Sequence, residues 1–211
     1  MGRELELTGK KVAVLVETEY IHEEVTYYKD FFEGLGAKVD FLTYLWGKAE
    51  RVIVSDVTEP GGTLYSMKVD KEIADFNPND YDFVLTAANY VACRLREVPP
   101  MGSLGDVDLL RSPAAVRFVA SAMANPFIVK GMLCHSLWIL TPNPELLKGR
   151  KVICHTVVLA DIYNAGAVYV PDESHVVVDE DLVTGRSAGD LKLYCESLLS
   201  AWRKLRNKTF H

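Results

Sequence analysis

The stretch Phe127-Ile-Val-Lys-Gly-Met-Leu-Cys134-His-Ser-Leu-Trp-Ile-Leu140 decides the fold that we expect for this chain. An apolar run ends abruptly on Cys134, and a second apolar run follows it at helix-like spacing. In an α/β protein this pattern predicts a buried strand, a sharp turn and a helix that starts at once. A residue on such a turn lies above the carboxyl edge of the sheet, beside backbone N–H groups and a helix N-terminus. These dipoles favour the reactive thiolate, although most free cysteines are simply small buried hydrophobes.

The composition is that of an ordinary globular protein and argues against several classes of function. The chain has 211 residues and a net charge of −6 without a basic cluster, which argues against a nucleic-acid partner. No apolar run approaches the roughly 18 residues that span a bilayer, and the charged N-terminus lacks the apolar core of a signal peptide. The cysteines lie far apart, without paired metal-ligand spacing. We therefore expect one domain over residues 1–211 in a reducing cytoplasm, with free thiols, no metal, no cofactor and no membrane partner.

Alternating strand and helix patterns predict an α/β fold. Residues 11–16 are a β-branched apolar run typical of a central parallel strand, residues 25–36 follow as a helix, and residues 38–43 form the next strand. Further strands are expected at residues 81–86, 151–155, 168–170, 175–178 and 181–184, and further helices at residues 113–125, 158–164 and 188–206. Two runs that flank Glu59-Pro-Gly-Gly62 predict a small antiparallel excursion over residues 51–69, at one edge of the sheet. Together these elements predict a flavodoxin-like three-layer sandwich with a central, mostly parallel sheet and a nucleophile elbow.

Two further groups are expected at the carboxyl edge of the sheet beside Cys134. Glu24 lies just past the first strand, and His155 ends the strand that follows the cysteine helix. A carboxyl near a thiolate repels its charge, so one of the pair should hold a proton, which Glu24 can share with the sulfur or pass to a substrate. His155 or His135 can act as acid or base at neutral pH. The plainer alternatives are a solvated helix start for Glu24 and an ordinary hydrogen-bonded histidine at position 155.

The order of several short motifs resembles that of the ThiJ/PfpI superfamily. The motifs are Lys11-Val-Ala-Val-Leu-Val16 with Glu24, Gly131-Met-Leu-Cys134-His135, Leu147-Lys-Gly-Arg-Lys-Val152, Asn164-Ala-Gly-Ala167 and Leu182-Val-Thr-Gly-Arg-Ser-Ala-Gly-Asp190. This group includes the parkinsonism-associated deglycase and an archaeal intracellular protease, on a class I glutamine-amidotransferase-like fold. The resemblance covers nearly the whole chain and is specific for the superfamily, but not for one activity.

The resemblance also implies roles by position. Cys134 resembles the elbow cysteine of the family, which is strained at φ > 0. Glu24 falls where the family places the carboxyl that contacts that sulfur. His135 matches the histidine of the protease-like branch, and His155 matches the active-site histidine of the deglycase and glutathione-independent glyoxalase branch. Because family members are commonly dimers or larger rings, the resemblance implies a homo-oligomer.

The chain departs from the family pattern around the expected pocket. Family members usually carry Pro-Gly-Gly after the strand at residues 81–86, where glycine N–H groups help to form an oxyanion pocket, but this chain reads Ala87-Ala88-Asn89-Tyr90. Alanine keeps its N–H and asparagine tolerates φ > 0, so the pocket can survive with intruding side chains. Tyr90 and Trp138 can shape it, although Trp138 fits the core equally well. The protease-branch glutamate is replaced by Cys93, and residues 89–112, rich in proline and glycine, are expected to be an inserted loop near the site.

The leading hypothesis is a cysteine-dependent enzyme that acts on a small electrophilic carbon. Cys134 would add to that carbon, N–H groups near Ala88 and His135 would stabilise the oxyanion, and Glu24 with a histidine would move protons. Within the family this implies glyoxalase-like or deglycase-like chemistry on a small molecule, or a hydratase or amidase variant. The alternative is a redox-sensing or chaperone-like stress protein in which Cys134 is oxidised rather than catalytic. Peptidase activity is a weaker third possibility, because the intersubunit glutamate is missing.

Overall fold

The structure is a computed structural model that describes residues 5–57, 59–97 and 105–208. Its strands are β1 (Lys11–Leu15), β2 (Lys38–Leu42), β3 (Arg51–Val54), β4 (Ser66–Val69), β5 (Phe83–Thr86), β6 (Val129–Leu133), β7 (Lys151–Val152), β8 (Val168–Tyr169), β9 (Val176–Asp179) and β10 (Leu182–Gly185). Its α-helices are α1 (His22–Gly34), α2 (Val91–Leu95), α3 (Ala114–Ala124), α4 (Leu159–Asn164) and α5 (Leu191–Lys208).

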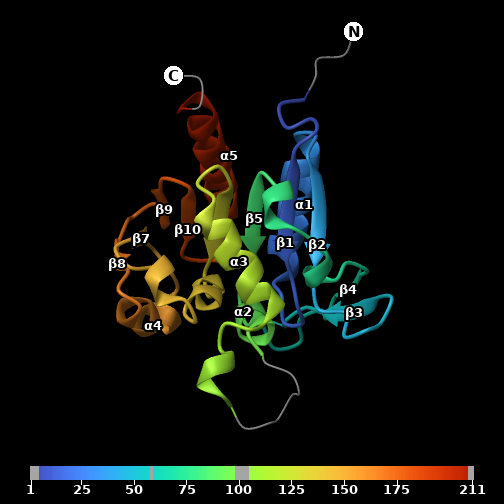
Figure 1. Cartoon of the computed structure of the whole chain (residues 1–211). Coiled ribbons are helices and arrows are strands. Elements are labelled where there is room, and N and C mark those ends of the chain that lie inside the picture. The colour runs from blue at the N-terminus through green and yellow to red at the C-terminus, as the bar shows by residue number, and fades with distance from the viewer. Residues whose placement is uncertain (1–4, 58, 98–104, 209–211) are drawn as a thin grey trace.

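A six-stranded sheet in the order β2-β1-β5-β6-β10-β9 organises the molecule (Figure 1). Neighbouring strands are parallel from β2 to β10, and only β9 in this sheet runs antiparallel to its neighbour. The inner strands β1, β5 and β6 are almost wholly buried, because both faces of a parallel sheet are covered and leave no alternating polar face.

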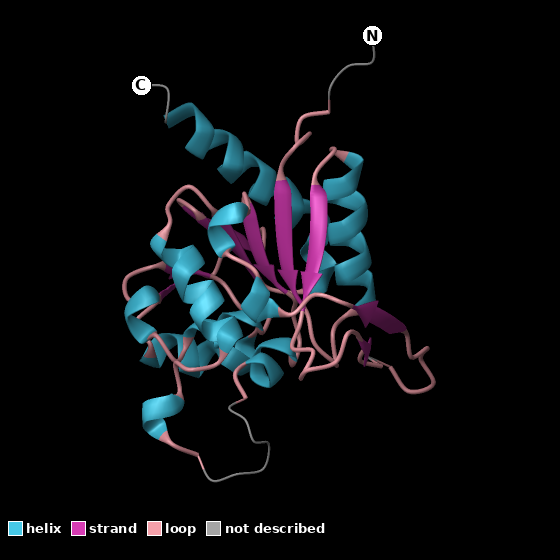
Figure 2. Cartoon of the chain, turned by 45° about the vertical axis from the view of Figure 1, so that its right-hand side comes forward, coloured by secondary structure: helices cyan, strands magenta, loops and turns pink. Residues whose placement is uncertain are grey.

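Helices cover the two faces of this sheet. Helices α1 and α5 contact each other and lie against one face, whereas α3 lies against the other (Figures 1 and 2). Helix α1 turns Val25, Tyr28 and Phe32 into the core, at the spacing expected of an amphipathic helix. The predicted flavodoxin-like three-layer sandwich is therefore confirmed.

Successive strands are added on opposite sides of β1, so the strand order has a switch point there. The chain moves from β1 to β2 on one side of the sheet, and later fills the other side from β5 through β6 to β10. In open α/β sheets a crevice forms at such a switch point, outside the carboxyl ends of the strands. The loops that follow β1 and β5 therefore meet at the position where this fold usually binds its ligands.

Three local predictions differ from the structure. The segment after Cys134 is a short 3₁₀ helix, Ser136–Leu140, rather than a full α-helix. Pro142 and Pro144 follow closely, and proline cannot continue a helix. Strand β7 has only two residues and pairs with β8 outside the central sheet, so His155 does not end a strand of that sheet. The irregular region 89–112 contains the helix α2 within its described part, while residues 98–104 lie outside the described residues.

The predicted antiparallel pair over residues 51–69 is confirmed, because β3 and β4 pair with Arg51 opposite Val69. The pair forms its own two-stranded sheet and joins the rest through single bridges such as Tyr20 to Ser55. It lies beside β2 at the end of the sheet where the parallel strands finish (Figure 1).

Candidate active site

Cys134 occupies a strained turn directly after β6. Its φ is +58°, in the left-handed region that a non-glycine residue rarely adopts. The Cys134 N–H donates to the carbonyl of Gly185 at 2.8 Å, and its carbonyl accepts from the His155 N–H at 3.3 Å. Such a conformation costs about 1–3 kcal/mol and persists only where its surroundings hold it. The turn is therefore fixed from two sides, as the nucleophile-elbow pattern predicts.

Glu24 is a fully buried carboxyl on the first turn of α1. It is 0% exposed, unlike its exposed neighbour Glu23, so it does not belong to a solvated helix start. Its Oε1 accepts from the Tyr28 O–H at 2.7 Å, and the Ala88 N–H donates to Oε2 at 2.9 Å and to Oε1 at 3.1 Å. Burial raises the pKa of Glu24 to about 8, although both hydrogen bonds favour the ionised form. At neutral pH this carboxyl therefore mostly carries a proton.

The sulfur of Cys134 lies in a less favourable electrostatic environment than the sequence indicated. Burial, followed by repulsion from a charged Glu24, raises the pKa of the Cys134 thiol to about 12. The backbone N–H groups of His135 and Asn89 oppose this shift in pKa but do not overcome it. The backbone N–H groups thus lower the pKa of Cys134 as expected, but by less than burial and Glu24 raise it. A short 3₁₀ helix aligns few peptide dipoles, and the residue is only 8% exposed.

The donors that face the sulfur differ in part from those expected. The Ala88 N–H is engaged by Glu24, whereas the Asn89 and His135 N–H groups interact with Cys134. Asn89 has φ +61°, and its side-chain amide donates to the Glu19 carbonyl at 3.0 Å and to Asp56 Oδ2 at 2.8 Å. Asn89 therefore adopts a positive φ, which asparagine tolerates better than most residues.

The two candidate histidines lie together. The rings of His135 and His155 meet edge to face, with centroids 4.9 Å apart. His155 Nδ1 accepts the Val157 N–H at 3.2 Å, so in the neutral ring the proton sits on Nε2. His135 is buried, and neither of its ring nitrogens has a hydrogen-bonding partner among the described residues. Burial and the adjacent His155 lower the pKa of His135, which keeps it neutral at physiological pH.

Aromatic side chains complete the cluster. The Tyr90 ring lies 5.8 Å from His135 and 6.4 Å from Trp138, between ring centroids. Trp138 is half-buried and its Nε1 donates to Asp161 Oδ2 at 2.7 Å. The structure therefore brings both predicted aromatic residues beside His135.

Sequence reasoning missed Tyr28 and Asp161, which hold Glu24 and Trp138 respectively. By its spacing Tyr28 belongs to the apolar face of α1, with Val25 and Phe32. The available signal was its spacing of four residues from Glu24, because such pairs are neighbours on a helix surface.

The described residues contain no group of three or more His, Cys, Asp or Glu side chains arranged to hold a metal ion. In the same part of the chain, no helix combines the length and apolar character needed to cross a membrane.

A doubly wound α/β sandwich with a cysteine on a strained strand-end turn and a buried carboxyl beside it defines the class of this protein. The chain belongs to the DJ-1/PfpI family, whose sequence model matches residues 98–201. This confirms the resemblance to the ThiJ/PfpI superfamily.

Two relatives and one solved structure are among the proteins that are similar to this chain. The putative cysteine protease YraA of Bacillus subtilis is 28% identical over 186 residues, which cover 88% of this chain and 94% of YraA. Protein/nucleic acid deglycase 2 of Escherichia coli is 28% identical over 191 residues, with coverages of 88% and 94%. A crystal structure from Anabaena variabilis contains DJ-1/ThiJ/PfpI-like and ferritin-like domains; it is 24% identical, with a TM-score of 0.74. That match covers 90% of this chain and 47% of the two-domain chain, and it shows the fold alone.

Proposed function

We propose that this protein is a cysteine-dependent enzyme that acts on a small electrophilic carbon, with glyoxalase-like or deglycase-like chemistry or a hydratase or amidase variant of it. The observation that carries the proposal is the placement of Cys134 at φ +58°, with the N–H groups of two neighbouring loops on its sulfur and the buried Glu24 beside it. A structural cysteine does not need a strained turn, so the strain supports a chemical role.

The first step is addition of the Cys134 thiol to a carbonyl. The S–C bond forms as the thiol proton leaves, and the carbonyl π pair moves to the oxygen. The Asn89 and His135 N–H groups are the proposed donors to that oxygen. Glu24, mostly protonated at neutral pH, then supplies the proton that completes a thiohemiacetal. A thiol with a raised pKa is a weak nucleophile at rest, so its proton must move in concert with the attack.

The geometry favours different roles for the two histidines. His135 is neutral and has no partner on either ring nitrogen among the described residues, so one nitrogen is free to accept the thiol proton. His155 holds its proton on Nε2 because Nδ1 is occupied, so it acts as a donor toward a substrate oxygen. We therefore propose His135 as the base and His155 as a hydrogen-bond donor.

The names of the relatives support two kinds of reaction, deglycation and peptide hydrolysis. One relative is named a deglycase and another a putative cysteine protease, at 28% identity each. The deglycase direction agrees better with this chain, because Cys93 stands where the protease-like branch supplies a glutamate. A redox sensor requires an accessible thiolate, and the buried, raised-pKa thiol of Cys134 counts against it.

The test compares turnover with oxidation. The wild-type protein is offered a panel of 2-oxoaldehydes, glycated amines and small amides, and Cys134→Ser is expected to lose at least about a thousandfold in rate. Cys195→Ala, which removes a buried thiol from α5 rather than from the turn, is the matched control and should retain activity. In parallel, mass spectrometry follows Cys134 after mild peroxide. Selective oxidation of Cys134 without turnover of any panel member would overturn the enzyme proposal in favour of a redox sensor.

We also propose a homo-oligomer in a reducing cytoplasm. The four cysteines are all free thiols, which suits a reducing compartment. The β3–β4 unit exposes Val52 at 65% and Leu64 at 59%, an apolar surface that suits contact with a second copy. Light scattering should give the mass of a dimer or larger assembly, and a monomer at micromolar concentration would contradict this part.

A further inference from the structure

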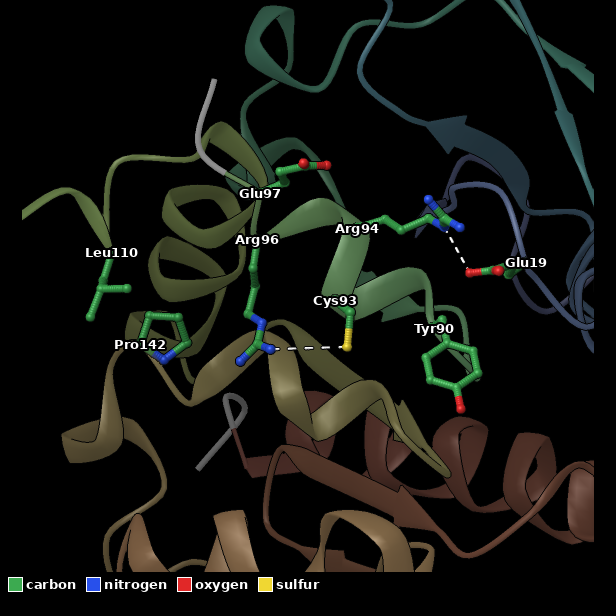
Figure 3. A pocket seen from close by; sticks show the side chains of 8 residues that line it. All are labelled: Glu19, Tyr90, Cys93, Arg94, Arg96, Glu97, Leu110 and Pro142. Carbon is green, nitrogen blue, oxygen red and sulfur yellow. Dashed lines mark hydrogen bonds and ion pairs between the residues drawn. The ribbon is translucent and has the colours of Figure 1, made fainter. Parts of the chain in front are cut away.

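A concave site lies beside α2, next to the aromatic cluster around His135. It is a cavity of about 500 Å³ lined by Glu19, Tyr90, Cys93, Arg94, Arg96, Glu97, Leu110 and Pro142 (Figure 3). Its volume is within the range of small-molecule sites. Cys134 does not line it, but Tyr90 belongs to both this cavity and the aromatic cluster around His135.

The cavity contains an arginine whose charge is not neutralised by the described part of the chain. Arg96 Nη1 donates to Thr141 Oγ1 at 2.6 Å, and Nη2 lies 3.9 Å from the Cys93 sulfur. No carboxylate among the described residues lies within ion-pair distance, and Nε is buried without a partner there. Glu97 extends away from the Arg96 guanidinium (Figure 3). A half-buried guanidinium without a carboxylate partner is costly, and an anion bound in the cavity would offset that cost.

Arg94 lies on α2, two residues before Arg96, and differs from it because its charge is paired within the protein. Its Nε donates to Glu19 Oε2 at 2.8 Å, and this ion pair sits at the opposite side of the cavity from Leu110 (Figure 3). One of the two arginines is therefore paired within the protein, and the other points into the cavity with its charge unmatched.

The wall beside Arg96 is apolar. Leu110 and Pro142 lie on one side of the guanidinium, and the Tyr90 ring, with 47% of the residue exposed, lies beyond Cys93 on the other (Figure 3). A cationic fork between apolar surfaces suits a ligand with a planar anionic end and an apolar body.

We propose that this cavity binds a small organic acid, whose carboxylate contacts the Arg96 guanidinium and whose apolar part packs against Leu110, Pro142 and Tyr90. The site does not depend on the chemistry proposed for Cys134. Because Tyr90 contacts His135, the occupant lies one side chain away from the cysteine turn.

Cys93 is a built-in reporter for this site. It lines the cavity and is partly exposed, whereas Cys134, Cys154 and Cys195 are buried. The experiment measures the rate at which iodoacetamide alkylates Cys93, by peptide mass spectrometry, with benzoate or its neutral isostere benzamide present. At a benzoate concentration that slows alkylation about fivefold, benzamide at equal concentration should slow it less than about twofold, because losing the carboxylate–guanidinium contact weakens binding by at least about fivefold. Equal protection by the two compounds, or none by either at millimolar concentration, would overturn the proposal without any variant.

Two arginine variants then test which guanidinium contacts the carboxylate of benzoate. Arg96→Gln should abolish the preference for benzoate over benzamide, and the paired-arginine control Arg94→Gln should retain it. Circular dichroism checks that both variants fold. Loss of the preference in Arg94→Gln with retention in Arg96→Gln would assign the anion to the wrong arginine and refute the inference.

Discussion

Replacing Glu24 by glutamine should change how the stability of this protein depends on pH. In the folded protein Glu24 is 0% exposed, and burial raises its pKa from 4.5 to about 8. Glutamine is the neutral isostere, and its carbonyl oxygen can replace Oε1, which accepts from both Tyr28 and Ala88. In the variant this oxygen can still accept from both donors, the amide nitrogen takes the place of Oε2 beside the Ala88 N–H, and the titration of the carboxyl is removed.

The sign follows from the direction of the shift. Because the folded state holds the Glu24 proton more tightly than the unfolded state, the contribution of this group is fully present below pH 4.5 and is lost as pH rises through about 8. At about 1.4 kcal/mol for each pH unit, the interval from 4.5 to about 8 corresponds to a loss of about 5 kcal/mol at most. That is comparable with the whole stability of many domains. The free energy of unfolding of Glu24→Gln should therefore exceed that of the wild type by an amount that grows from pH 5 to pH 8.

The assay is urea unfolding of both proteins at pH 5, 6, 7 and 8. This window lies below the range in which the buried thiols titrate, since burial raises the pKa of Cys134 and Cys154 to about 12. Glu23→Gln, which removes an exposed carboxyl one position away, is the matched control. A difference between Glu24→Gln and the wild type that stays constant over this window would refute the assignment of a protonated, buried Glu24.

Three further predictions address the packing around the site. Tyr28→Phe removes a donor that favours the ionised carboxyl, so the pKa of Glu24 should rise further, by about one to two units. NMR titration of labelled glutamate measures this pKa, and a fall would contradict the hydrogen bond. Gly131→Ala places a Cβ 2.4 Å from Leu85 Cδ2 and 2.5 Å from the Tyr194 hydroxyl, so it should destabilise by about 1–3 kcal/mol in urea unfolding, whereas Gly34→Ala, with open space around it, should not destabilise. Asp181→Asn should cost about 3 kcal/mol or more at pH 7, because it leaves the fully buried Lys130 ammonium without its carboxylate, and a change below 1 kcal/mol would show that the pair is dispensable.

Much of the framework was predictable because it depends on local patterns. The β-branched run at residues 11–16 and the periodicity of Val25, Tyr28 and Phe32 identify β1 and α1 without knowledge of the rest of the chain. The position of Cys134 after an apolar run likewise predicts a sharp turn, and the family resemblance implies its positive φ; the structure places Cys134 at φ +58°.

The remainder depends on contacts between distant segments. The pKa of Cys134 is set by burial and by Glu24, and neither can be read from the residues beside it. The engagement of the Ala88 N–H by Glu24 joins the loop after β5 to the first turn of α1. The helix after Cys134 ends before Pro142 as its sequence indicates, but it is a 3₁₀ helix, which apolar spacing alone does not distinguish from a short α-helix.

The hydrogen bond that holds the cysteine turn to β10 has a consequence for the chain during its synthesis. The Cys134 N–H donates to the carbonyl of Gly185, the last residue of β10, which is translated well after the cysteine. While a ribosome is still synthesising the segment between them, nothing can hold the turn from that side, and β6 lacks the neighbour that completes its ladder. The thiol thus emerges as an ordinary reactive cysteine and becomes sheltered only when the last strand docks. Chemical damage to Cys134 should therefore concentrate in unfinished chains rather than in mature protein.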